Sequence, residues 1–227
     1  EIDPEYASAY SSRGEAKYEL EDYYGAIADH TKAVEIEPDY SFYYSYRGDA
    51  KLDLEDYSGA IVDYNKAIEL DPEYDFYYSY LASAYSSRGD AKLDLEDYSG
   101  AIVDYNKAIE LDPEYDFYYS DRGDAKFNSE DYSGAIEDYS KAIELGPANG
   151  FKYANRGAAK YYLDSYSSAI EDLNKAIELD PEDSYSYYFR GLAKESLGYS
   201  NGACSDWEKA AELGDVDAAT LVTENCQ

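Results

Sequence analysis

The sequence is poor in the residues that build metal centres and active sites. Its 227 residues include two cysteines, one histidine and no methionine. A zinc site needs several Cys or His ligands, which this composition does not supply. No glycine-rich phosphate loop and no nucleophile motif occurs either. We therefore expect a protein that is not an enzyme and that binds no metal and no cofactor.

Basic residues are also scarce. Nineteen Lys and Arg stand against 50 Asp and Glu, for a net charge of −31. Nucleic acids and anionic membranes both bind through Lys and Arg, so neither is an expected partner. The charge favours a basic partner, although it could also serve only to keep a long surface soluble. No apolar run approaches the ~20 residues that span a bilayer, so no membrane insertion is expected.

The few prolines are regularly spaced. Each lies within a variant of "AIELDPEY", and their spacings are 34, 34, 41, 34 and 34 residues, which indicates an internal repeat. The second repeat reads as two helices, at about 41–54 and 57–70, separated by "EDYSG". Pro72 ends the second helix because proline cannot continue one. The prolines are Pro4, Pro38, Pro72, Pro113, Pro147 and Pro181.

This pattern resembles the tetratricopeptide repeat (TPR) family over almost the whole chain. The resemblance implies an all-α fold: a right-handed superhelical solenoid of six helix pairs plus a C-terminal capping helix. Arg47 occupies a position where the family commonly has Leu, and this variant resembles a bacterial subfamily. The residues that carry the resemblance in the second repeat are Tyr44, Gly48, Ala60, Tyr64, Ala67 and Pro72. The repeats are expected at about 5–38, 39–72, 73–113, 114–147, 148–181 and 182–214, in one domain, with the cap at 215–226.

Eighteen of the nineteen bases occupy three repeated positions, and only Lys152 is left over. Each Arg precedes a Gly, and an Asp recurs sixteen residues later. We expect each Arg to pair with that Asp between packed helices, because the guanidinium fork suits a carboxylate. The alternative is a ladder of arginines that grips anionic ligands. The structural pairs proposed are Arg47 with Asp63, Arg88 with Asp104, and Arg122 with Asp138.

The resemblance implies an inner groove lined mainly by the first helix of each pair. That face is acidic in the earlier repeats and aromatic in the later ones, which suits a basic or amphipathic peptide. The alternative is a merely solvated acidic face. The candidate groove residues are Phe42, Asp49, Asp53, Asp90, Asp94, Phe117, Asp124, Phe127, Tyr161, Tyr162, Tyr185 and Tyr188.

Two functions follow from these features. The first is a non-catalytic protein–protein interaction scaffold that binds a basic or amphipathic peptide or partner protein. The alternative is a structural protein that self-associates end to end into an oligomer or filament, since many surface tyrosines favour interfaces.

The three "RGD" triplets lie mid-helix and do not indicate an adhesion loop. His30 takes the place of Tyr64 and Tyr105 and is expected at the edge of the core.

The end of the chain departs from the repeat. We expect the capping helix to turn Val216, Ala219 and Leu221 inward, because a solenoid must close its last apolar face. Cys204 and Cys226 flank the turn before it and are expected to form a disulfide. A disulfide favours a periplasmic or extracellular location, whereas two free thiols would favour the cytoplasm.

One repeat carries seven extra residues, within "YYSYLASAYSSRGD". Residues 47–79 and 88–120 are identical, which suggests a recent duplication. Seven residues turn a helix by close to two full turns, so the core face stays in phase. We expect one continuous helix over about 73–95 rather than a loop at 81–87.

Overall fold

The structure is a computed structural model that describes residues 6–226. These residues form thirteen α-helices and no strand, and none of the helices has the length and apolarity to cross a membrane. The helices are α1 Ala7–Tyr18, α2 Tyr23–Ile36, α3 Ser41–Asp53, α4 Tyr57–Leu70, α5 Phe76–Asp94, α6 Tyr98–Leu111, α7 Asp116–Asn128, α8 Tyr132–Leu145, α9 Gly150–Tyr162, α10 Tyr166–Leu179, α11 Ser184–Ser196, α12 Ser200–Glu212 and α13 Val216–Asn225.

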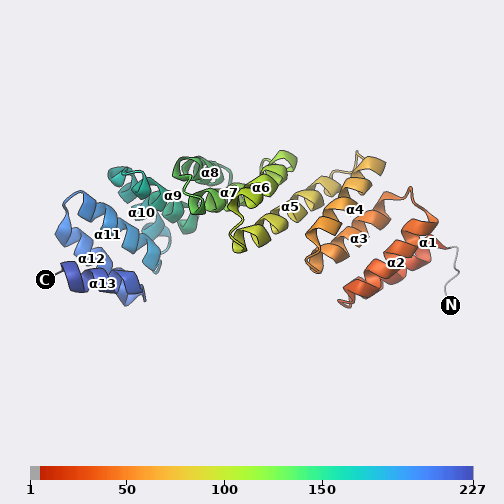
Figure 1. Ribbon diagram of the computed structural model, residues 1–227, viewed down its shortest axis with the longest axis horizontal. Coiled ribbons are helices and arrows are strands. Elements are labelled where there is room, and N and C mark those ends of the chain that lie inside the picture. Colours follow the sequence, from red (N-terminus) through yellow and green to blue (C-terminus); the bar gives the residue numbers. More distant parts are fainter. Residues whose placement is uncertain (1–5, 227) are drawn as a thin grey trace. The chain divides into compact units, whose positions relative to one another are not determined.

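The chain divides into two compact units, Glu1–Pro113 and Glu114–Gln227. Within each unit consecutive helices pack as pairs, and each pair packs on the next (Figure 1). The first helices of successive pairs also contact one another, α1 with α3 and α3 with α5 in the first unit, and α7 with α9 and α9 with α11 in the second. The expected all-α fold of helix pairs is confirmed. The single domain and its repeat boundaries stay a prediction.

The helix ends follow from local side-chain chemistry. Asp56 caps α4 by accepting a hydrogen bond from the backbone N–H of Gly59 at 3.0 Å, and Asp22, Asp97 and Asp131 cap their helices in the same way. Such caps satisfy backbone donors that the first turn of a helix leaves open. The residue before each of these caps takes a left-handed conformation, with φ between 60° and 65° at Glu21, Glu55, Glu96 and Glu130.

Glycine lets the two helices of a pair approach closely. A Cβ atom on Gly48 of α3 would lie 2.8 Å from Cε1 of Tyr64 in α4, closer than side-chain atoms normally pack. The glycine after each repeated arginine lies in the same way against a bulky side chain of the second helix. Those side chains are His30, Tyr64, Tyr105, Tyr139, Leu173 and Trp207.

The seven extra residues extend a helix. Helix α5 is continuous over 19 residues and unbroken through 81–87, although it begins at Phe76, three residues later than expected. Leu81 and Ala84 of the extension are buried against Ile61 and Tyr64 of α4. The extension is thus packed into the core of the first unit.

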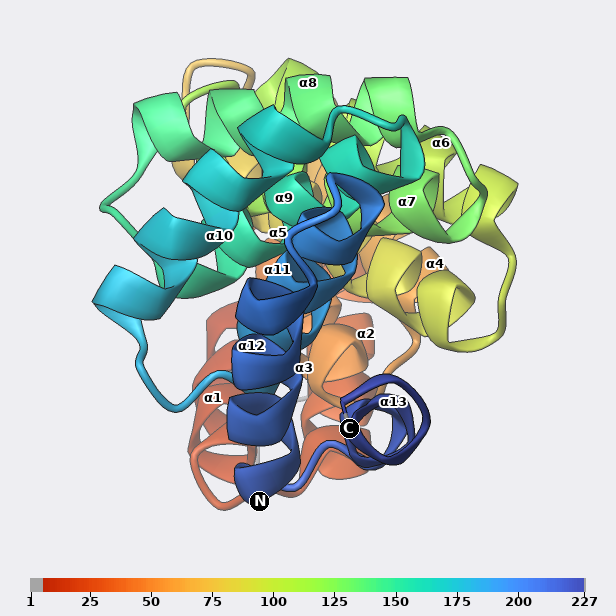
Figure 2. The same ribbon diagram turned by 90° about the vertical axis from the view of Figure 1, so that its left-hand side faces the viewer.

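The last helix, α13, packs against α12 (Figure 2). Ala218 is buried with Trp207 and Ala210, and Leu221 is half-buried beside them. The expected inward positions of Val216 and Ala219 are wrong: Val216 is 78% exposed and Ala219 is also exposed. Asp215 caps the helix by accepting a hydrogen bond from the N–H of Ala218 at 2.8 Å. With the helix beginning at this cap, the side that faces α12 is not the one expected from the sequence. A disulfide joins Cys204 to Cys226.

Candidate functional site

Each helix pair holds a three-membered ion cluster. Arg47 of α3 donates from Nε and Nη2 to the two carboxylate oxygens of Asp63 in α4, at 2.9 and 2.6 Å. Lys51, one turn after Arg47, adds a contact to the same carboxylate at 2.8 Å. Asp63 is buried, so the two cations satisfy a carboxylate that would otherwise be costly to bury. The structure thus places Arg47 on the aspartate that its spacing predicted.

The same cluster recurs in the other five pairs. Arg88 contacts Asp104, and Arg122 contacts Asp138, each through two hydrogen bonds of 2.6–2.8 Å. Burial alone would raise the pKa of Asp104, but hydrogen bonds from Arg88 and Lys92 outweigh it and lower that pKa. The remaining clusters are Arg13–Lys17–Asp29, Arg156–Lys160–Asp172 and Arg190–Lys194–Asp206.

Ion pairs engage every base of the chain. The lysine of each second helix contacts a glutamate three residues later, as Lys66 does with Glu69 at 2.8 Å. Lys152, the base outside the repeat pattern, is buried in α9 and contacts Asp116 of α7. All nineteen Lys and Arg side chains therefore have a carboxylate partner. This arrangement argues against a ladder of arginines held open for anions.

The carboxylates of the candidate groove differ in exposure. Asp53, Asp90 and Asp94 are exposed, whereas Asp49 is half-buried. Asp49 accepts a hydrogen bond from the hydroxyl of Tyr64 at 2.7 Å. Burial raises the pKa of Asp49 to about 6, and the nearby Asp53 adds to the rise while the bond from Tyr64 opposes it.

The tyrosine–aspartate bond recurs in the next two pairs. Tyr105 donates to Asp90 at 2.7 Å, and Tyr139 donates to Asp124 at 2.6 Å. Asparagine at Asn155 adds a second donor to Asp124 at 3.0 Å. Sequence reasoning assigned these three aspartates to the groove and missed their bonds to the core. The sequence did contain a signal for these bonds. An aspartate follows Arg-Gly in the repeats whose second helix carries this tyrosine. In the two repeats that have Leu173 and Trp207 instead of the tyrosine, the residue after Arg-Gly is Ala158 or Leu192.

The aromatic candidates of the first unit are partly packed. Phe42 is half-buried, and its ring lies 5.1 Å from Tyr74 and 5.8 Å from Tyr77, measured between ring centroids. Beside it, a hollow of about 370 Å³ is lined by residues of α1, of α3 and of the residue before α3. Phe42 thus contributes to the packing between helix pairs as well as to the wall of this hollow.

In the second unit all the aromatic candidates except Phe117 come together. Phe127, Tyr161, Tyr185 and Tyr188 are half-buried around the buried ring of Phe189. Tyr162 contacts the same group at its edge, 5.7 Å from Phe127, and is 47% exposed. Phe117 is 49% exposed and lies apart from that cluster, against Tyr115. The later first helices therefore carry an aromatic cluster with an open edge.

Two family models match the chain. The model described as TPR repeat matches residues 48–87 and 89–129, and the model described as Tetratricopeptide repeat matches residues 118–149 and 153–183. No curated protein sequence matches the chain significantly.

Solved structures share the fold. YrrB, described as a TPR protein with an unusual peptide-binding site, is 20% identical, with a TM-score of 0.68 over 86% of this chain and 97% of its own. A TPR repeat-containing protein from Cytophaga hutchinsonii is 20% identical, with a TM-score of 0.66 over 89% of this chain and 78% of its own. MamA is 27% identical, with a TM-score of 0.58 over 76% and 96%. With the matches of both family models, the 34-residue period and the helix pairs, the chain belongs to the tetratricopeptide repeat family.

Proposed function

We propose that this protein is a non-catalytic interaction scaffold whose first helices bind a basic or amphipathic segment of a partner protein. The observation that carries the proposal is the distribution of charge. All nineteen bases are paired with other carboxylates, while Asp53, Asp90 and Asp94 are exposed on the first helices of the first unit. Those carboxylates can attract a cationic segment, because the bases of the same helices are paired with other carboxylates.

The second unit has an apolar surface of its own on its first helices. An amphipathic helix binds through apolar anchors spaced three and four residues apart. The exposed edge of Tyr162, next to the cluster around Phe189, offers an aromatic surface for such an anchor. YrrB, which shares the fold, has a peptide-binding site, and partner binding of that kind is the role proposed for this chain.

Paired variants test the proposal. The probe is a fluorescein-labelled amphipathic peptide of about 16 residues built from Lys and Leu, and binding is measured by fluorescence anisotropy. D53N/D94N removes two charges from the first helices, and we expect the affinity to fall by about fivefold or more at low salt. The matched control E69Q/E110Q removes two charges from exposed positions of α4 and α6, and its affinity should stay within about twofold. Equal losses in the two variants would contradict the proposal.

Light scattering of the unliganded protein tests the other function. A scaffold is expected to remain a monomer at both low and high salt, although the charge of −31 per copy opposes association only at low salt. Growth into large species when salt screens that charge would favour the self-associating structural protein instead.

We also propose that the protein works in an oxidising compartment, periplasmic or extracellular. The disulfide between Cys204 and Cys226 supports this proposal, because such bonds persist where thiols are not kept reduced. Thiol labelling of the protein isolated under non-reducing conditions should find no reactive cysteine. Two reactive cysteines would contradict it.

A further inference from the structure

His30 is an exception at a repeated position. In the next three pairs the corresponding side chains are Tyr64, Tyr105 and Tyr139, whose hydroxyls reach an aspartate of the first helix. In the first pair the imidazole packs on Gly14 as the tyrosine rings pack on their glycines. The imidazole of His30 is shorter than the phenol of tyrosine. Glu15 occupies the position that the bonded aspartate has in the next three pairs. The first pair therefore lacks the tyrosine hydroxyl that fills this space in the next three pairs.

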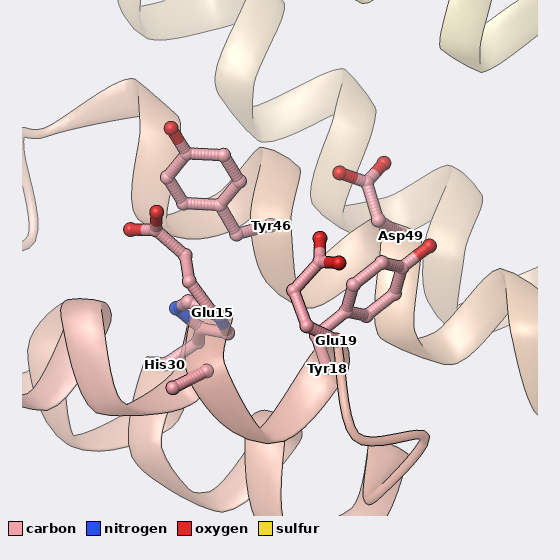
Figure 3. A pocket seen from close by; sticks show the side chains of 7 residues that line it. Glu15, Tyr18, Glu19, His30, Tyr46 and Asp49 are labelled. Carbon is pink, nitrogen blue, oxygen red and sulfur yellow. The ribbon is translucent and has the colours of Figure 1, made fainter.

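A pocket of about 300 Å³ opens at this place, between α1, α2 and α3 (Figure 3). Three carboxylates surround it, those of Glu15 in α1, of Glu19 directly after α1 and of Asp49 in α3. In Figure 3 the carboxylate of Glu15 lies beside the ring of Tyr46, while those of Glu19 and Asp49 lie on the opposite side, near Tyr18. Two aromatic rings and three acidic groups thus form the wall of one small pocket.

His30 adds a polar group with no partner. Its side chain is 1% exposed and forms part of the pocket lining, and its Nδ1 has no hydrogen-bond partner within the described residues. A buried polar atom of this kind costs free energy until a ligand or water pairs with it. Burial lowers the pKa of His30 to about 4, so the ring is neutral at pH 7 and does not repel a cation.

The bases nearest in sequence do not neutralise this pocket. Arg13 and Lys17 of α1 both contact Asp29, which is buried on α2. Arg47 of α3 contacts Asp63 in the same manner. The pocket therefore retains its negative charge, because none of these three bases contacts the carboxylates that line it.

We propose that this pocket binds one cationic side chain, lysine or arginine, of the partner polypeptide. The charged end enters the pocket that the carboxylates of Glu15, Glu19 and Asp49 surround. The rings of Tyr46 and Tyr18 cover its alkyl stem and add a cation–π contribution. The inference rests on the proposed function, because it gives one anchor position to a basic segment bound along the same first helices.

The single histidine makes the test direct. The probes are the Nα-acetyl N-methylamides of lysine, arginine and norleucine, titrated at constant ionic strength into the full-length protein. NMR of the imidazole reports on one residue, because His30 is the only histidine. The lysine or the arginine probe should shift the His30 signals saturably, with a dissociation constant on the order of 10 mM. The uncharged norleucine probe should leave them unchanged. An equal response to norleucine, or no saturable response to either cation, would overturn the proposal.

Two variants strengthen the test. E15Q/E19Q should weaken binding of the cationic probe by about threefold or more, whereas E69Q/E110Q should not change it. H30Y installs the side chain of the next three pairs, so it should fold normally, fill the pocket and abolish binding. Ligand-observed NMR of the probe replaces the lost histidine signal in this variant. Unchanged probe binding by H30Y would overturn the proposal. If only the pocket fails, D53N/D94N still weakens binding of the amphipathic peptide, so the two proposals fail separately.

Discussion

Tyr64 of α4 donates a hydrogen bond from its hydroxyl to the carboxylate of Asp49 in α3 at 2.7 Å. This bond connects a side chain of the core to an acidic residue of the candidate binding face. Tyr64 is fully buried and Asp49 is half-buried. The contact connects the two helices of the pair through a polar group that must stay paired. It also fixes the position of one of the three carboxylates around the proposed cation pocket.

Replacing Asp49 by Asn should stabilise the protein near neutral pH. Burial raises the pKa of Asp49 from 3.8 to about 6, so the folded state favours the protonated acid. The stability contributed by this group is complete below about pH 3.8 and is lost as pH rises through about 6. D49N keeps an acceptor for Tyr64 and carries no charge. It should exceed the wild type by about 1 kcal/mol at pH 7.5, with the difference shrinking near pH 4.5.

Urea unfolding at those two pH values measures the difference. E110Q, at an exposed position of α6, serves as the control and should change stability by less than about 0.5 kcal/mol at both. A gain for D49N that is the same at both pH values would show that burial of the charge is not its cause.

Replacing Gly48 by Ala should destabilise the protein, although alanine is the better helix former. The added Cβ would lie 2.8 Å from the buried ring of Tyr64 and would push the two helices apart. We expect a loss of about 2 kcal/mol in thermal unfolding. G202A is the control, because its Cβ would meet only the flexible stem of Lys194, at 3.3 Å. A neutral or stabilising G48A would contradict the close approach of α3 and α4.

Replacing Asp104 by Asn should be strongly destabilising. Arg88 and Lys92 would lose their shared carboxylate, for a loss of about 3 kcal/mol at pH 7. The pKa of Asp104 is lowered in the folded state, so its contribution is present above about pH 3.8 and is lost as pH falls further. The gap between wild type and D104N should therefore close in unfolding experiments near pH 2. E110Q, which breaks only an exposed pair with Lys107, should cost less than about 0.5 kcal/mol.

The buried pair of Lys152 and Asp116 has a counterpart in the first unit. There, at the same helix positions, Tyr77 donates to Ser41 at 3.0 Å. K152M should cost about 3 kcal/mol because it leaves a buried acid without its cation. The double variant D116S/K152Y rebuilds the tyrosine–serine pair and should recover most of that loss in the same unfolding assay. A double variant no more stable than K152M would show that the two sites are not equivalent.

The sequence was enough to predict the features that recur in every repeat. Arg47 and Asp63 could be paired because the same sixteen-residue spacing recurs in every repeat, so six copies supported one interpretation. The continuity of α5 followed from helix geometry alone, since seven residues preserve the phase. The direction of α13 did not follow, because this helix occurs once and its cap at Asp215 sets which side faces α12.

The candidate site was only partly predictable for a different reason. His30 was visible as a substitution for tyrosine, but the pocket beside it depends on the volume that the shorter ring leaves and on the backbone of three helices. The bonds from Tyr64 and Tyr105 to their aspartates depend on which way each side chain turns. A helical face pattern places Asp49 near the groove without saying that a core hydroxyl reaches it.

The central claim is that acidic first helices bind a basic segment by charge. The most direct measurement is the affinity of the labelled Lys and Leu peptide between about 50 and about 500 mM salt. We predict a loss of about tenfold or more across that range, because screening weakens attraction between exposed charges. A peptide of the same pattern with Glu in place of Lys should not bind. An affinity for the basic peptide that does not change with salt would contradict the account.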